Sequence, residues 1–73
     1  MNIKELKAEL DRLGVPQRVY SLTGWRDERL CLEFRQDKWH IFYVERGAER
    51  SMREFRTEDE ACGFMLEELK YEV

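Results

Sequence analysis

Apolar residues near the start of the chain recur at intervals of three and four positions, which places them on one face of a helix. These residues are Ile3, Leu6, Leu10 and Leu13. Asn2 is positioned to cap the helix, and Glu5 follows three residues later in the capping-box arrangement. Gly14 and Pro16 end it, because glycine favours the position after a helix and proline cannot continue one. The pattern predicts a helix over about residues 3–13.

In the middle of the chain the apolar pattern changes to alternation, which is typical of strands. Over residues 29–35 one face carries Leu30, Leu32 and Phe34, and the other carries Cys31, Glu33 and Arg35. Residues 38–45 are rich in aromatic and β-branched side chains, which favour strands. Residues 19–22 are a shorter candidate for a first strand, and residues 50–55 for an edge strand with Met52 or Phe55 inward. The pattern predicts three or four strands.

The connection at Gln36 and Asp37 leaves two registers for the central hairpin, and a one-residue change swaps the faces of a strand. A loop with an even number of residues places, beside the apolar face of the first strand, Trp39, Ile41 and Tyr43. A three-residue loop instead places there His40, Phe42 and Val44. The even loop is the expected one.

A second helix is predicted to begin after Thr57, which forms a capping box with Glu60. Glu58 and Asp59 lie in its first turn, where negative charge suits the helix dipole. Its apolar stripe consists of Ala61, Met65, Leu66 and Leu69, with Phe64 or Cys62 on the flank. Gly63 costs about 1 kcal/mol relative to alanine inside a helix, and we expect it to allow close packing of the helix on the sheet.

The order of elements predicts one α+β domain over residues 1–73. It consists of a helix, a three- or four-stranded antiparallel sheet and a second helix, with the helices packed on one face. The chain has only 73 residues, so its core is thin. Charged residues make up 40% of it, against about a quarter in an average domain. A small core therefore lies under a heavily charged surface.

The negative charge is concentrated at the C-terminal end. The formal net charge is -3, yet residues 57–73 contain six acidic residues and one basic residue, while the preceding residues contain more basic than acidic ones. A nucleic-acid binder usually carries a basic excess. A concentrated negative field instead steers a basic partner.

The sequence predicts no membrane segment, metal site or cofactor. The first seven residues are too charged for a signal peptide, and no apolar stretch has the length of a membrane span. Cys31 and Cys62 lie outside any metal or redox spacing motif. The glycines form no phosphate-binding motif. We expect a cytoplasmic protein with reduced thiols.

His40 is the only histidine, and an enzyme built on it needs a nucleophile and an orienting acid. Glu33 can lie across the hairpin from it and Cys31 on the same face, which gives a nominal Cys-His-Glu set. A strand histidine paired with a cross-strand carboxylate is the commoner arrangement. The expectation is a protein that is not an enzyme and has no catalytic residues.

Several short motifs along the chain carry a resemblance to a known family. They are Leu-Gly-Val-Pro from Leu13, Tyr-Ser-Leu-Thr-Gly from Tyr20, Cys-Leu-Glu from Cys31, Trp-His-Ile-Phe-Tyr from Trp39, Glu-Arg-Gly from Glu45, Phe55, and Glu-Asp-Glu-Ala-Cys from Glu58. Over about residues 13–69 the chain resembles small immunity proteins encoded beside polymorphic or contact-dependent growth inhibition toxins. The resemblance implies a cytoplasmic antitoxin that binds a secreted toxin domain and blocks it. It carries over no catalytic residue and does not identify the binding residues.

The expected partner is thus a cognate toxin domain, a nuclease or another nucleic-acid-modifying enzyme with a basic active site. Glu67, Glu68 and Glu72 are the candidate binding residues, because negative charge near the C-terminal end of a helix opposes its stability and suggests another use. Trp25 and Arg26 are the alternative anchor, since these residue types are enriched at binding hot spots. No nucleic acid, membrane or small-molecule ligand is expected.

The alternative is a small nucleic-acid-binding module, because double-stranded RNA-binding domains share this element order. Such domains need lysines at the start of the last helix to hold phosphates. Glu58, Asp59 and Glu60 occupy that position here and would repel them.

Overall fold

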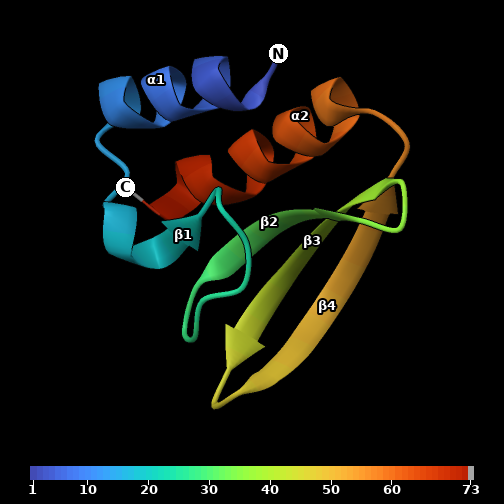
Figure 1. Ribbon diagram of the computed structural model, residues 1–73. Coiled ribbons are helices and arrows are strands. Elements are labelled where there is room, and N and C mark those ends of the chain that lie inside the picture. The colour runs from blue at the N-terminus through green and yellow to red at the C-terminus, as the bar shows by residue number, and fades with distance from the viewer. Residues whose placement is uncertain (73) are drawn as a thin grey trace.

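Two helices lie on the same side of a four-stranded sheet in the computed structural model (Figure 1). Residues 1–72 are described. The helices are α1 (Ile3–Leu13) and α2 (Glu58–Leu69), and the strands are β1 (Tyr20–Ser21), β2 (Leu30–Arg35), β3 (Lys38–Glu45) and β4 (Ala48–Phe55). Single 3₁₀ turns precede β1 and follow α2, as η1 (Gln17–Val19) and η2 (Lys70–Glu72). The α+β fold with helices on one face is confirmed.

Helix α1 begins and ends where the sequence predicts. The Asn2 side chain accepts from the Glu5 backbone N–H at 2.8 Å, and the Glu5 carboxylate accepts from the Asn2 backbone N–H at 2.9 Å. This capping box satisfies two of the backbone donors that a helix leaves free at its start. Gly14 ends the helix with a φ of 80°, in the left-handed region that glycine adopts at no steric cost.

The sheet is mixed, which corrects the expectation of an antiparallel sheet. Its order is β1-β2-β3-β4, and β1 runs parallel to β2 while the other neighbours are antiparallel. Antiparallel neighbours can be joined by a tight hairpin, whereas parallel ones need a longer connection. Residues 22–29 provide that connection and bring the chain back before β2 begins.

The central hairpin has the register of the even loop. Phe34 pairs with Trp39, and the pairing continues to Leu30 opposite Tyr43. Both turn residues, Gln36 and Asp37, have positive φ angles of 53° and 62°. Two such residues form a type I′ turn, whose twist matches that of the flanking strands. The turn therefore fixes which side chains face the helices.

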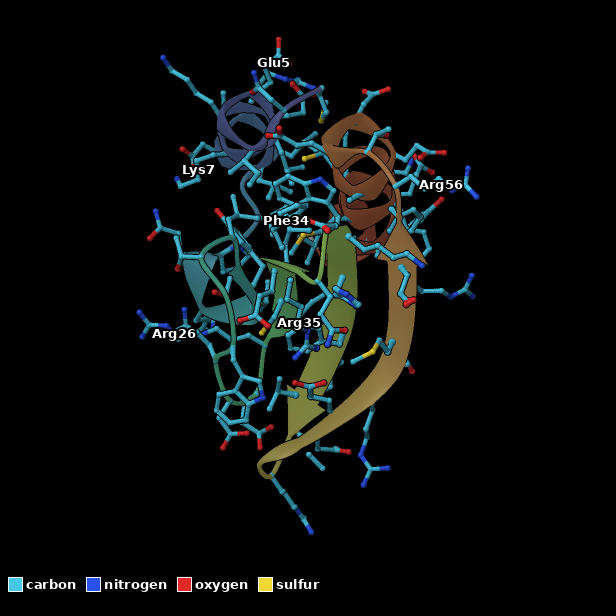
Figure 2. The ribbon with its side chains drawn as sticks, turned by 45° about the vertical axis from the view of Figure 1, so that its right-hand side comes forward. Glu5, Lys7, Arg26, Phe34, Arg35 and Arg56 are labelled. Carbon is cyan, nitrogen blue, oxygen red and sulfur yellow. The ribbon has the colours of Figure 1, made fainter. Side chains whose placement is uncertain are left out.

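Strand β4 forms one edge of the sheet and curves strongly (Figure 2). A β-bulge accounts for part of the bend, because Ser51 and Met52 together face only Phe42 of β3. Ser51 has a φ of 56° at this point. Met52 is exposed, whereas Phe55 is partly buried and packs on Phe64 of α2 with ring centroids 5.3 Å apart. Of the two candidates for an inward side chain, the structure selects Phe55.

The main core lies between the helices and the sheet. Its fully or almost fully buried residues are Leu6, Leu10, Val15, Tyr20, Leu32, Ile41, Ala61, Cys62, Met65 and Leu69. Burial of such side chains supplies most of the folding free energy, at about 25 cal/mol per Å² of apolar surface. Because one side of α2 is buried in this core, the charged side of the helix faces solvent.

A second, smaller cluster lies on the sheet face opposite the helices, which we call the open face. Cys31, Phe42 and Val44 are completely buried there. The Arg35 guanidinium lies 5.0 Å above the centre of the Phe42 ring, and the loop of residues 22–29 covers the face near Glu33. The loop carries several candidate binding residues, and it lies on the sheet face that contains this small cluster.

The expectation for Gly63 is wrong. Gly63 is exposed, and no atom lies within 4 Å of the position that a Cβ would occupy. The buried side of α2 is the one that carries Ala61, Cys62 and Met65. Gly63 therefore leaves the helix weaker without bringing it closer to the sheet.

Candidate functional site

The three acidic residues in the first turn of α2 take part in local structure. The Glu58 carboxylate accepts from the Ile3 backbone N–H at 2.7 Å. Asp59 pairs with the N-terminal amino group, whose pKa is raised mainly by this hydrogen bond. The Thr57 hydroxyl accepts from the Glu60 backbone N–H and donates to the Glu60 carboxylate, both at 3.1 Å. These acids cap α2 and join it to α1, so their charge has a structural explanation.

Glu67 and Glu68 lie in the second half of α2, on its exposed side. The Glu67 carboxylate accepts from the Lys70 ammonium at 2.9 Å, in an exposed pair that contributes little to stability. Glu68 makes no hydrogen bond or ion pair with the described side chains, and it lines a groove. The backbone of Glu72 belongs to η2, and its side chain lies outside the described part of the chain.

The groove beside Glu68 has a volume of about 270 Å³ and brings a second carboxylate close to it. We call it the acidic groove. Its lining consists of Val19, Glu28, Leu30, Tyr43, Glu68 and Leu69. Glu28 comes from the loop before β2, and its carboxylate accepts from the Arg46 backbone N–H at 3.0 Å. Two carboxylates that line one groove together with apolar side chains suit a lysine or arginine, whose aliphatic stem packs while its charged end is paired.

The loop of residues 22–29 is held at both ends. The Ser21 hydroxyl donates to the Gly24 carbonyl at 2.7 Å. The Arg26 backbone N–H donates to the Cys31 sulfur at 3.3 Å. At the far end, the Gly47 backbone N–H donates to the Asp27 carboxylate at 2.9 Å. A loop fastened in this way loses little conformational freedom when it binds a partner.

Trp25 lies on this loop with 45% of its surface exposed. More than half of the side chain is therefore covered, and a large aromatic surface remains open to solvent. The covered part of the side chain agrees with a cap over a thin core, and the exposed part agrees with a binding anchor. A partly exposed tryptophan on a fastened loop has the geometry of a binding anchor.

Arg26 faces a different surface from the acidic groove. It projects from the same side of the molecule as Lys7 (Figure 2) and lines a pocket with Lys4, Lys7 and Arg29. The predicted binding residues are thus divided between two sites, with Glu68 on the acidic groove and Arg26 on a basic pocket. Glu28 could not be predicted as a site residue, because only the folded loop places it in the same groove as Glu68.

The three residues of the nominal Cys-His-Glu set, Cys31, His40 and Glu33, make contacts within the sheet and its neighbouring loop. Glu33 and His40 are cross-strand neighbours, whereas Cys31 is opposite Phe42. Burial raises the pKa of the Cys31 thiol, which also lies 3.3 Å from the Arg26 carbonyl. A nucleophilic cysteine needs a lowered pKa. His40 Nε2 lies 3.2 Å from the Arg35 carbonyl, so the imidazole helps to hold the hairpin turn.

Within residues 1–72, no group of three histidine, cysteine or carboxylate side chains is placed to hold a metal ion. Neither helix in this part of the chain combines the length and apolar character that a membrane crossing requires. Both cysteines are buried free thiols, Cys31 under the open face and Cys62 in the main core. Comparison with protein-family models finds no match, and comparisons with curated proteins and with solved structures find none.

Proposed function

We propose that this protein is a cytoplasmic antitoxin that binds a basic toxin domain and blocks its active site, in the manner of small bacterial immunity proteins. The observation that carries the proposal is the acidic groove, which is lined by Glu28 and Glu68 together with the apolar side chains of Val19, Leu30 and Leu69. Glu58, Asp59 and Glu60 have partners within the fold, whereas Glu68 has none among the described side chains. Glu68 is therefore available to an external cation.

In this proposal one lysine or arginine of the toxin enters the acidic groove. Its aliphatic part packs against Val19 and Leu30, and its charged end lies between the two carboxylates. Enzymes that act on nucleic acids have basic active sites, so a residue taken in this way is unavailable to the substrate phosphates. Glu67 adds to the field that guides the toxin toward the groove.

Trp25 supplies the apolar part of the same interface. Its exposed indole sits on a loop that also carries Glu28, and the loop is fastened to the β3–β4 turn through Asp27 and Glu28. The anchor is therefore ordered before binding, which lowers the entropy lost in the complex. Charge would set the rate of encounter, and the tryptophan would set the lifetime of the complex.

The direct test is a binding experiment with the product of the neighbouring upstream gene. The two purified proteins are mixed at micromolar concentration and examined by size-exclusion chromatography and calorimetry. The proposal expects a stoichiometric complex and loss of the partner's cleavage of DNA or RNA. If a toxin-like neighbour is present and no complex forms at this concentration, the proposal is wrong.

A further inference from the structure

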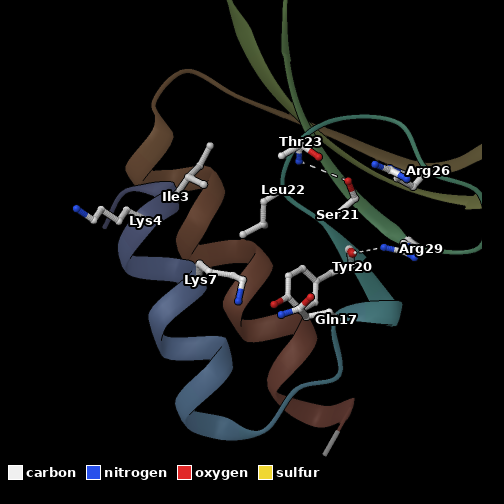
Figure 3. Close-up of a pocket in the computed structure, with 10 residues that line it drawn as sticks. All are labelled: Ile3, Lys4, Lys7, Gln17, Tyr20, Ser21, Leu22, Thr23, Arg26 and Arg29. Carbon is white, nitrogen blue, oxygen red and sulfur yellow. Dashed lines mark hydrogen bonds between the residues drawn. The ribbon is translucent and has the colours of Figure 1, made fainter.

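A basic pocket lies between α1, η1, β1 and the loop of residues 22–29 (Figure 3). Its volume is about 480 Å³, within the range of pockets for small molecules. Four of its lining residues are cationic, namely Lys4, Lys7, Arg26 and Arg29. None of the lining residues is acidic, although the chain as a whole has a net charge of -3. The pocket is therefore suited to an anion.

Tyr20 provides a second, independent indication of a ligand. Its side chain lines the pocket and is only 4% exposed, yet the hydrogen of its hydroxyl has no acceptor among the described residues. Buried polar atoms of native proteins nearly always have a partner. The Lys7 ammonium lies beside this hydroxyl in Figure 3 and interacts with it electrostatically and as a hydrogen-bond donor, which leaves the hydroxyl hydrogen free. An anion bound next to Lys7 would give the hydroxyl an acceptor.

The two arginines are positioned by the backbone around them. The Arg29 guanidinium donates to the Tyr20 carbonyl at 3.5 Å, and the Arg29 carbonyl accepts from the Val44 backbone N–H at 3.0 Å. The Arg26 backbone is held by Cys31. Among the described side chains, no carboxylate forms an ion pair with Arg26 or Arg29. Both charges therefore line the pocket without a carboxylate partner.

Lys7 is the cation that a ligand must compete for. Its ammonium donates to both oxygens of Asp11 at 2.7 Å, and this bond is the main reason that its pKa is raised. The pair is an exposed one on a helix surface, which is weak and easily exchanged. A dianion offers Lys7 a better partner. The lysine then turns from Asp11 toward the bound anion.

The remaining lining is apolar. Ile3 and Leu22 line the pocket with the Tyr20 ring, and they provide a surface for an uncharged part of a ligand. A pocket with apolar walls and a few convergent polar groups is typical of sites for small organic ligands. An inorganic ion alone would leave this surface unused.

We infer that this pocket binds a small organic phosphate. The phosphate lies among Lys7, Arg26 and Arg29 and accepts a hydrogen bond from the Tyr20 hydroxyl, while the organic part packs on Ile3 and Leu22. The sequence gives no sign of a small-molecule ligand, because these residues meet only in the fold. The inference does not depend on toxin binding, since the basic pocket and the acidic groove share no lining residue.

The test is a titration of the ¹⁵N-labelled protein, followed by NMR, with inorganic phosphate and with phenyl phosphate. We expect saturable shifts centred on Tyr20, Thr23 and Arg29, with phenyl phosphate binding about tenfold more tightly. The double variant Arg26→Gln/Arg29→Gln should weaken binding about tenfold or more, because it removes charge-assisted hydrogen bonds. The control Arg50→Gln/Arg56→Gln has the same change in charge on the far edge of the sheet, and it should bind like the parent protein.

Tyr20→Phe separates a ligand contact from a structural role. The variant should keep its thermal stability, because the lost hydroxyl donates no hydrogen bond within the fold, and should bind phenyl phosphate several-fold more weakly. Shifts that do not saturate by about 10 mM phenyl phosphate would overturn the inference. Equal losses in the two double-arginine variants would overturn the location of the site. Equal affinity for inorganic phosphate and phenyl phosphate would contradict the claim that the ligand has an organic part. Unchanged binding by Tyr20→Phe would contradict the role of the hydroxyl.

Discussion

The Glu58 carboxylate accepts a hydrogen bond of 2.7 Å from the Ile3 backbone N–H, and this bond joins the first turns of the two helices. Ile3 is the first residue of α1, so its N–H has no acceptor within its own helix. The same carboxylate lies in the first turn of α2, where its negative charge interacts favourably with the positive end of the helix dipole. One side chain thus serves both helices.

Replacing Glu58 by alanine should lower the free energy of unfolding by about 1–2 kcal/mol, because a partly buried backbone donor loses a charged acceptor. Glu68→Ala is the matched control on the same helix, and its effect should stay within about 0.5 kcal/mol. Urea unfolding of both variants measures the difference. Similar losses in the two would show that the acids of α2 are not divided between structure and binding.

Gly63→Ala should stabilise the protein by about 1 kcal/mol. The position is inside α2 and open to solvent, so the added methyl group meets no neighbour and the helix gains propensity. Gly47→Ala should have the opposite effect, by about 1 kcal/mol, because Gly47 has a φ of 80° that alanine adopts only with strain. Thermal unfolding of the pair checks both signs. A destabilised Gly63→Ala protein would indicate that this side of α2 has a packing partner after all.

Stability should fall at alkaline pH because of Cys62. Burial raises the pKa of this thiol from 9.0 to about 11, and the nearby Glu58 carboxylate adds to the shift. Between these values the unfolded chain has lost the proton and the folded chain keeps it, so the folded state becomes less favourable as the pH rises. The expected loss is about 2 kcal/mol by pH 11, at about 1.4 kcal/mol per pKa unit.

The contribution of Cys62 is isolated by comparing the parent protein with Cys62→Ala. The difference in unfolding free energy between them should be constant below about pH 8.5 and should shrink above it. Tyrosine and lysine residues titrate in the same range, but they are common to both proteins and cancel in the difference. A difference that does not change with pH would mean that the buried thiol does not control alkaline stability.

Trp25→Ala should shorten the lifetime of the complex with the toxin partner. The exposed indole contributes apolar contact area, and loss of such an anchor acts mainly on the dissociation rate. The effect should be about tenfold or more and nearly independent of salt, because no charge is removed. Surface plasmon resonance at two salt concentrations measures it. An unchanged dissociation rate would contradict the role of Trp25 as a binding anchor.

The helices and the central hairpin could be predicted because their determinants are local. The capping box of α1 lies within four residues, and its bounds agree with the structure. The hairpin register follows from Gln36 and Asp37, two adjacent residues that adopt a type I′ turn. The determinants lie in neighbouring residues in both cases, although the turn left two registers open and the structure selects the even loop.

The parallel β1 strand, the environment of Gly63 and the acidic groove could not be predicted in this way. The direction of β1 depends on the path of residues 22–29, which no local pattern specifies. The side of α2 that faces the sheet decides the environment of Gly63. Glu28 and Glu68 are far apart in sequence and line the same groove only because the loop is fastened to the β3–β4 turn through Asp27 and Glu28.

The rate at which the protein associates with its toxin partner tests the central claim most directly. The double variant Glu67→Gln/Glu68→Gln is compared by stopped-flow with Glu9→Gln/Glu54→Gln, which makes the same change in net charge on α1 and β4. At an ionic strength of about 10 mM, where charges act over about 30 Å, the first variant should associate several-fold more slowly than the control. At about 1 M the difference should vanish. Equal rates for the two variants at low salt would contradict the account.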